Sequence, residues 1–198
     1  MPYHHGALRE ALLKAGEALL EQGGVPALTL RAVAREARVS HAAPAHHFGD
    51  LSGLLTALAA RGFAKLGEAV SGAMARAGAD PAARLTAMGR AYVGFARCHP
   101  GLFVLMSRGG RLDLENPDLY AAMAETSRLL RAATEARAPA SGRREGVAFV
   151  AAVWSLVHGF SLLLIDGRLK SLLAAMPGGD PDALLKAVLE VSHFVPRG

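Results

Sequence analysis

The sequence lacks the cysteines of a disulfide scaffold and the ligand spacings of common metal sites. It contains one cysteine, Cys98, among 198 residues, which excludes a disulfide framework and fits a reducing compartment such as the cytoplasm. The eight histidines fall in no Cys-x-x-Cys or His-Glu-x-x-His spacing, and adjacent histidines on a helix point about 100° apart. We therefore expect no structural metal and no cofactor.

Catalytic, targeting and strand patterns are also lacking. There is no nucleophile elbow and no glycine-rich phosphate loop, so we do not expect an enzyme. The first residues lack the continuous apolar run of a signal peptide. Alternation of apolar and polar residues never extends beyond a few positions, which argues against strands. With 52% hydrophobic and 20% charged residues the chain can bury a core, and we expect an all-α fold.

The charge distribution gives little support to a nucleic-acid partner. The whole chain carries a formal net charge of +5, but within residues 1–60 five basic and five acidic residues cancel. The basic ones are Arg9, Lys14, Arg31, Arg35 and Arg38, and the acidic ones are Glu10, Glu17, Glu21, Glu36 and Asp50. Any prediction of DNA binding therefore depends on a motif.

Such a motif lies between Leu30 and Phe48. A first helix should begin after Thr29, a good N-cap, with one apolar face at Leu30, Val33, Ala34 and Ala37. Residues 38–40 interrupt it, and Ser40 is expected to cap a second helix, 41–48, whose outward positions are small or polar. This pattern predicts a helix-turn-helix, in which the second helix lies in the major groove of DNA.

The remaining helices are predicted by their end signals. A helix at 7–22 should end at Gly23 and Gly24, and Asp50 should cap a long helix at 51–77. Asx-Pro pairs predict further helices at 81–98, 117–137 and 181–195. A short helix is expected at 101–107, with loops at 108–115 and 138–142. The charge-free run 146–165 is long enough to span a membrane, but we interpret it as a core helix with no membrane partner.

Several of these segments together resemble the TetR family of one-component transcriptional regulators. The resemblance is carried by Tyr3-His4-His5-Gly6, Leu28-Thr29-Leu30-Arg31, Val39-Ser40 and His47-Phe48. Further along, Trp154 with Val157-His158-Gly159 resembles the signature of a C-terminal subtype called WHG. The resemblance implies a three-helix DNA-binding head at 1–50 and a ligand-sensing, dimerising body at 51–198.

The resemblance also implies partners and site residues. Two copies would pair through the helix at 146–165 and the last helix, and the homodimer would bind an inverted-repeat operator in double-stranded DNA as a cytoplasmic repressor. The implied DNA-binding residues are Thr29, Arg31, Ser40, His41, Ala42, Ala43, His46 and His47. A hydrophobic or aromatic small-molecule effector would contact Tyr92, Phe95, Phe103, Met106, Trp154 and His158, although Trp154 and His158 could equally be a packing pair.

Four residues depart from the family pattern around the helix-turn-helix. Pro44, expected at the fourth position of its helix, removes only the first intrahelical bond and is tolerable there. Arg38 stands where the family usually has glycine, so a non-glycine residue is expected in a left-handed conformation, at a cost of about 1 to 2 kcal/mol. Ala45 and Leu51 stand where the family usually has tyrosine and lysine, which hold DNA phosphates. Two functions therefore stay open: a ligand-responsive repressor, or a dimeric small-molecule-binding protein of the same fold with weakened or lost DNA binding.

Overall fold

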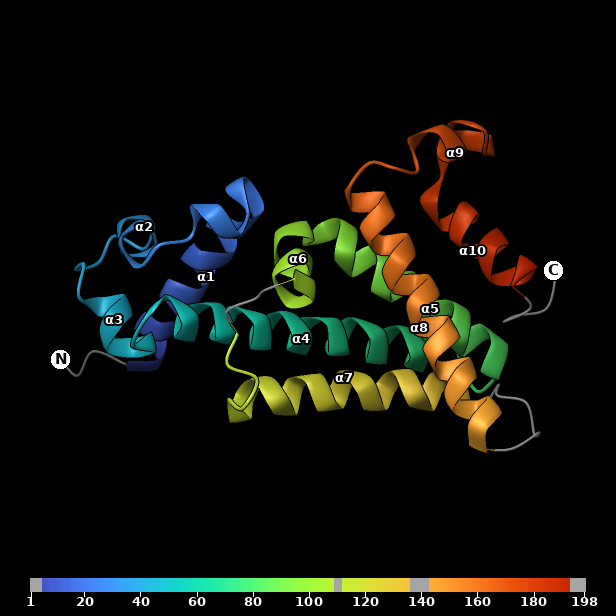
Figure 1. Ribbon diagram of the computed structural model, residues 1–198, viewed down its shortest axis with the longest axis horizontal. Helices are drawn as coiled ribbons and strands as arrows, with labels where there is room; N and C mark the ends of the chain where they lie inside the picture. The colour runs from blue at the N-terminus through green and yellow to red at the C-terminus, as the bar shows by residue number, and fades with distance from the viewer. Residues whose placement is uncertain (1–4, 109–111, 136–142, 193–198) are drawn as a thin grey trace. The chain divides into compact units, whose positions relative to one another are not determined.

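The computed structural model describes residues 5–108, 112–135 and 143–192 (Figure 1). This part of the chain is helical and contains no strand, which confirms the all-α expectation. The elements are α1 (His5–Gly23), η1 (Val25–Ala27), α2 (Leu30–Glu36), α3 (Ala43–Phe48), α4 (Leu51–Arg76), α5 (Pro81–Cys98), α6 (Pro100–Arg108), α7 (Pro117–Glu135), α8 (Arg143–Ile165), α9 (Lys170–Ala174), η2 (Pro177–Gly179) and α10 (Pro181–Val191).

Short polar side chains begin the helices where the sequence predicts them. Asp50 accepts a hydrogen bond of 2.9 Å from the amide of Gly53, and Asp80 accepts one of 2.8 Å from Ala83. Asn116 and Asp180 each accept bonds from two amides in the first turns of α7 and α10. Because proline occupies the first helical position after three of these caps, its missing N–H costs no hydrogen bond.

Some predicted boundaries differ from those observed. α3 begins at Ala43, not at residue 41, because Pro44 has a fixed φ and no N–H and is therefore best placed in the first turn. Its N-cap is Ala42, so the predicted side-chain cap by Ser40 is wrong, and only the carbonyl of Ser40 accepts a bond, from Ala43. The short helices η1, α9 and η2 have no counterpart among the predicted ones. Residues 3–4, 109–111, 136–142 and 193–195, which also carry predictions, lie outside the described residues.

Helix α2 ends in a left-handed turn formed by Arg38. Its φ is 56°, and it is the non-glycine residue with positive φ in the described chain. The amide of Val39 donates to the carbonyl of Ala34 at 3.0 Å and that of Arg38 to Arg35 at 3.1 Å, which is the hydrogen-bond pattern of a Schellman motif. The left-handed conformation expected for Arg38 is therefore confirmed, and the turn sets the direction in which α3 leaves α2.

The chain divides into two compact units. Unit 1 comprises residues 1–65 and 99–124, and unit 2 comprises residues 66–98 and 125–198. Helix α4 contributes its first fifteen residues to unit 1 and the rest to unit 2. This division follows packing, so the functional boundary near residue 50 stays a prediction.

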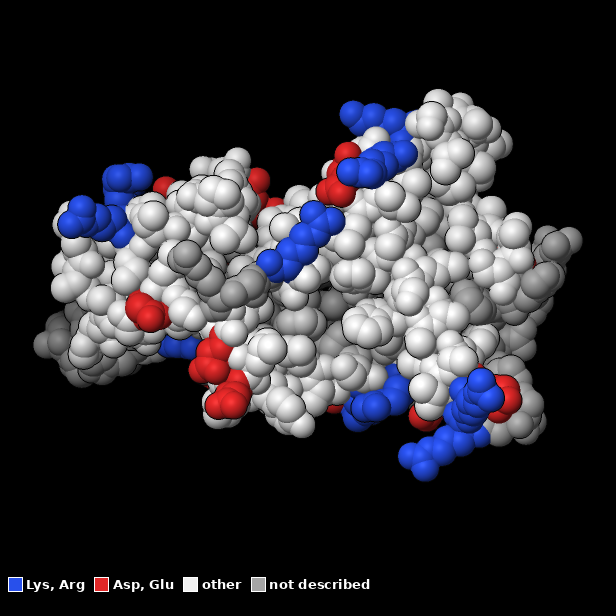
Figure 2. All heavy atoms as spheres, viewed as in Figure 1, with Lys and Arg blue, Asp and Glu red and all other residues white. Residues whose placement is uncertain are grey.

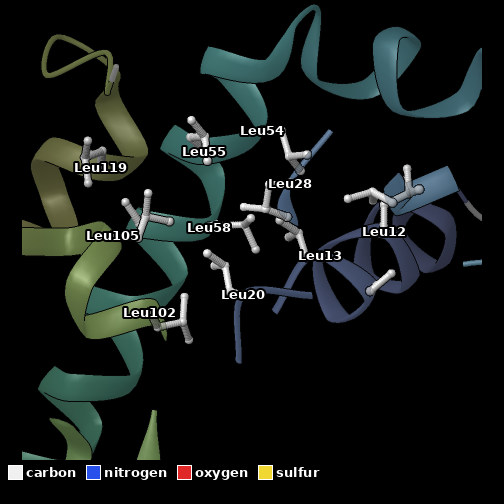
Figure 3. Close-up of a cluster of buried hydrophobic side chains, with 13 residues drawn as sticks. Leu12, Leu13, Leu20, Leu28, Leu54, Leu55, Leu58, Leu102, Leu105 and Leu119 are labelled. Carbon is white, nitrogen blue, oxygen red and sulfur yellow. The ribbon is translucent and has the colours of Figure 1, made fainter. Parts of the chain in front are cut away.

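A leucine-rich core holds unit 1 together (Figure 3). α1 and α4 contribute most of it, and α6, the start of α7 and the segment before α2 add the rest. Its largest fully buried members are Leu12, Leu20, Leu54, Leu58, Leu102, Leu105 and Leu119. Each such side chain contributes about 1.5 to 3 kcal/mol relative to exposure. Val33 of α2 lies in the same cluster, so the helix-turn-helix is attached to this core.

The start of α6 is fitted against the end of α1. A Cβ on Gly101 would lie 2.5 Å from the carbonyl oxygen of Leu20, which is closer than real Cβ atoms approach. In the same place the carboxylate of Glu21 accepts hydrogen bonds from the amides of Gly101 at 3.0 Å and Leu102 at 3.3 Å. Glycine thus permits the close approach, and Glu21 satisfies two amides that a helix start leaves unpaired.

Partly buried ion pairs join α1 to α4 on another side of unit 1. Arg61 forms two hydrogen bonds with Glu10, at 2.5 and 2.8 Å, and is also paired with Glu17. Lys65 lies 2.6 Å from Glu17. The hydrogen bond from Arg61 lowers the pKa of Glu10, and the one to Glu10 raises the pKa of Arg61. Glu10 and Glu17 are therefore both neutralised by bases of α4.

In unit 2, α5 packs against both α8 and α10. Gly89 of α5 lies in ordinary contact with Val157 of α8 and Leu189 of α10, with its would-be Cβ at 3.6 Å from each side chain. All three residues are buried. Arg97 and Asp182 form a longer ion pair of 3.5 Å between α5 and α10.

Helix α8 is long and apolar enough to cross a membrane by length and composition. Its most apolar window has a mean hydropathy of 2.1, and 22% of that window is buried in this chain. Val147 and Trp154 lie on its exposed side, with 65% and 53% of their surface accessible. A core helix of a soluble protein passes the same test of length and composition, and an apolar surface of this kind is also typical of a subunit interface.

We expect Arg61→Ala to lower the free energy of unfolding by about 1 to 3 kcal/mol, because it removes two hydrogen bonds to Glu10 and the ion pair with Glu17, whose side chain is only 15% exposed. Lys14→Ala is the control, since Lys14 is 69% exposed and 3.8 Å from Glu10, and should change stability by less than about 0.5 kcal/mol. Urea unfolding followed by circular dichroism measures both, and equal midpoints for the two variants would contradict this assignment.

Arg38→Gly should raise the free energy of unfolding by about 0.5 to 1 kcal/mol, because glycine adopts positive φ without a Cβ clash but has more backbone freedom to lose. Arg38→Ala keeps the left-handed strain and removes the same side-chain charge, so it serves as the matched control. Thermal melting of the three proteins provides the measurement. A glycine variant that melts with the alanine variant would show that the turn is not strained.

Candidate DNA-binding surface and effector site

Thr29 is the N-cap of α2, the first helix of the helix-turn-helix. Thr29 has extended backbone angles, and its hydroxyl accepts a hydrogen bond of 3.0 Å from the amide of Ala32. Arg31 lies in the first turn of α2 and is exposed. Both predicted phosphate contacts therefore lie on the surface at the start of α2, where backbone amides also point outward.

The predicted base contacts lie in and just before α3. Ser40, His41 and Ala42 are exposed in the turn that precedes the helix, so His41 and Ala42 do not project from a helix as the sequence suggested. Within α3, His46 is exposed, and Ala43 and His47 are partly buried. Pro44 and Phe48 face the interior of unit 1 instead, Pro44 buried and Phe48 packed against the leucine core. All eight predicted DNA-binding residues belong to unit 1.

The acids of unit 1 are mostly engaged in internal contacts, which the cancelled charge of residues 1–60 did not reveal. Glu10 and Glu17 pair with α4, Glu21 caps α6 and Asp50 caps α4. By contrast, Arg31 and Arg35 are exposed one helical turn apart on α2 and form no ion pair with a described residue. Figure 2 shows basic side chains gathered over α2. Unit 1 thus presents a basic surface next to α3 although its formal charges nearly balance.

Arg9 is a further surface charge, outside the helix-turn-helix motif. It is exposed on α1, and its guanidinium carbon lies 5.6 Å from the centre of the Phe48 ring, at the end of α3. The rings of His46, His47 and Phe48 are also neighbours, with centroids 5.6 and 6.3 Å apart. A sequence signal was present, because no acid stands three or four positions from Arg9 on α1 to pair with it.

In unit 2 the fold brings together three of the predicted effector contacts. The hydroxyl of Tyr92 on α5 lies 2.9 Å from Nδ1 of His158 on α8, and the imidazole tautomer decides which group donates. The Trp154 and His158 rings have centroids 6.3 Å apart. Burial raises the pKa of Tyr92 to about 12. The arrangement offers a wall of aromatic rings with one partly buried polar pair, which suits an aromatic or hydrophobic molecule with a single polar group.

The other three predicted effector contacts are distributed differently. Phe95 is buried one turn from Tyr92 on α5, in unit 2. Phe103 and Met106 lie on α6 in unit 1, where Phe103 is fully buried and Met106 packs against Gly62 of α4. Sequence reasoning could not foresee this grouping, since all six residues share the same apolar or aromatic character. Among the described residues, no three His, Cys, Asp or Glu side chains come close enough to hold a metal ion.

Comparison with known proteins places these features in a family. The model described as "Tetracyclin repressor-like, C-terminal domain" matches residues 85–191. The model described as "Bacterial regulatory proteins, tetR family" matches residues 12–58, which contain the helix-turn-helix. A comparison with curated protein sequences finds no match.

Solved structures share the fold over nearly the whole chain. A protein with unknown function from Rhodococcus sp. RHA1 is 35% identical, covers 96% of each chain and has a TM-score of 0.75. PfmR, a TetR family transcriptional regulator from Thermus thermophilus, is 20% identical over 94% of this chain and 99% of its own, with a TM-score of 0.60. The multidrug binding protein EbrR, solved with imidazole, is 24% identical over 100% of this chain and 95% of its own, with a TM-score of 0.58.

The family resemblance first seen in the sequence is thus confirmed at both ends of the chain. The Trp154 and Val157-His158-Gly159 signature lies within the region matched by the C-terminal model, which agrees with a WHG-type domain. Because that model alone covers more than half of the sequence, this chain belongs to the TetR family, whose members are transcriptional regulators and not enzymes.

Proposed function

We propose that the chain is a ligand-responsive repressor that binds an inverted-repeat operator in double-stranded DNA as a homodimer in the cytoplasm. The observation that carries this proposal is the helix-turn-helix surface of unit 1, where Arg31 and Arg35 are exposed on α2 while the three acids of α1 are engaged by α4 and α6. Basic side chains position a protein on phosphates, and the exposed residues at and before α3 reach base edges. Family membership supports the same conclusion.

The homodimer is supported by the surface of unit 2. Val147 and Trp154 of α8 and Val191 of α10 are all more than half exposed in the single chain. Exposed apolar side chains on these two helices, both of which pack on α5, are stabilised when a second copy covers them, and a two-fold axis repeats the same contact twice. Two α3 helices related by that axis would bind successive major grooves, which requires an inverted repeat.

The effector site is proposed at Tyr92, Trp154 and His158, with Phe95 beside them. A ligand there changes DNA affinity only if it binds the operator-compatible and operator-incompatible states with different affinities, a difference of a few kcal/mol. The role of Phe103 and Met106 as effector contacts remains a prediction from the family resemblance. The sequence contains one tryptophan, so its fluorescence reports on this site alone.

A second candidate function is a dimeric small-molecule-binding protein of the same fold that has lost tight DNA binding. The observation that favours it is the surface beside the basic residues of α2. Ala45 is exposed on α3 without a hydrogen-bonding group, and Leu51 starts α4 without a charge. Neither side chain can hold a phosphate.

A mobility-shift titration of the purified full-length chain distinguishes these functions. The probe is DNA from upstream of its own gene, with excess unrelated duplex as competitor and at two salt concentrations. We expect a complex that resists competitor, with a dissociation constant of about 10 nM or lower. Binding that the competitor abolishes would contradict the repressor and favour the second function. The variant Ala45→Tyr with Leu51→Lys would then gain specific binding from almost none.

The buried phenol of Tyr92 should ionise at a higher pH than an ordinary tyrosine, because burial raises its pKa to about 12. Since the folded state holds this proton more tightly than the unfolded state, its contribution to stability should be lost as the pH rises from about 10 to 12. Tyrosinate absorbance measures the titration, and Tyr92→Phe should remove the late step. A wild-type titration without a late step would contradict the proposed burial.

A further inference from the structure

We propose that Arg9, held on the ring of Phe48, is a contact to the DNA phosphate backbone at the edge of the groove that α3 would enter. The inference rests on the proposed function, since it names a further residue of the same DNA-binding surface. The ligand it takes is a phosphodiester of duplex DNA, bound without regard to base sequence.

The guanidinium of Arg9 has a defined position on the ring of Phe48. Phe48 is the last residue of α3, and its ring packs against the leucine core, so it is held by the fold of unit 1. The guanidinium carbon of Arg9 lies 5.6 Å from the centre of that ring. A planar guanidinium over an aromatic face keeps its N–H groups pointing outward at the edges, where they can bind an oxygen. Arg9 is thus a surface charge with a defined place beside α3.

Among the described residues, no acid forms an ion pair with Arg9. Glu10 is the next residue, but adjacent residues on a helix point about 100° apart, and Glu10 is engaged by Arg61 of α4. Arg9 forms no ion pair within the described residues, and the positions three and four away on α1 hold no acid. Asp50, which lies two residues beyond Phe48, caps the amide of Gly53.

Other permanent positive charges near α3 come from α2. α2 supplies Arg31 and Arg35 on one side of the helix-turn-helix, and α3 itself carries no arginine or lysine. The row of His46, His47 and Phe48 rings ends at Arg9, so Arg9 is the permanent charge at the far end of α3. Ala45 and Leu51 offer no phosphate ligand nearby. With Arg9, charged groups from both α1 and α2 flank α3.

The test compares salt dependence of DNA binding among full-length variants. The probes are a duplex selected by the unmodified chain from a random-sequence pool and a scrambled duplex of equal length, both followed by fluorescence anisotropy. Lys14→Ala is the matched control, because it removes one exposed positive charge from the same helix at a place away from Phe48. Arg9→Lys keeps the charge without the planar group that stacks on the ring.

We expect Arg9→Ala to reduce the slope of log affinity against log salt by about 0.9 per protomer, so that its deficit grows about threefold per protomer when salt is lowered fourfold. The loss should be equal for selected and scrambled duplexes, because a phosphate carries no sequence. Arg9→Lys should restore the slope but not the full affinity, and Lys14→Ala should leave the slope unchanged. Circular dichroism melting should show all variants folded as the unmodified chain.

Two results would overturn the proposal, and they differ in what else they contradict. If the unmodified chain binds its selected duplex and Arg9→Ala has the same slope as Lys14→Ala, Arg9 is not a contact although the repressor function stands. If the unmodified chain selects no duplex, the proposed function fails and Arg9 has no DNA to bind. A loss confined to the selected duplex would also contradict a phosphate contact, because it indicates a base contact.

Discussion

The leucine core between α1, α4 and α6 is the constraint on which the helix-turn-helix of this protein depends. α2 and α3 are helices of seven and six residues, too short to be stable alone in water. Their apolar residues, including Val33 and Phe48, join the core that α1 and α4 supply. Gly101 allows α6 to approach the backbone of Leu20, and Glu21 completes the hydrogen bonds at that contact. The geometry of α3 is therefore set by packing at a distance.

The same packing sorts the charges of unit 1. A formal charge of zero over residues 1–60 suggested little attraction for DNA, but it counted acids that the fold engages elsewhere. Glu10 and Glu17 are satisfied by Arg61 and Lys65 of α4, which lie beyond that stretch of sequence. What matters for a polyanionic partner is the charge that reaches the surface beside α3, and there the arginines of α2 stand without such partners among the described residues.

The second unit shows how one helix can serve two surfaces. α8 is apolar over most of its circumference. Val153 and Val157 are buried, with Val157 against Gly89 of α5, while Val147 and Trp154 stay exposed. His158 is bonded to Tyr92, so its polarity is used inside the unit. The twenty-residue charge-free run thus combines a core face with an exposed apolar face, and the exposed face is the one proposed above to be covered by a second copy of the chain.

The sequence by itself determined the longer helices and the family of the chain. The Asx-Pro starts, the glycines after α1 and the left-handed Arg38 are local signals, since each bond that forms them spans only a few residues. One local prediction was wrong: Ser40 does not cap α3, because Pro44 lies in the first turn and the helix begins at Ala43. Tertiary structure alone decided that Arg61 meets Glu10 across 51 positions, that Tyr92 meets His158 across 66, and that Arg9 lies on Phe48. Such pairs depend on how helices pack. The apolar periodicity of one helix indicates its buried face but not which distant side chain will contact it.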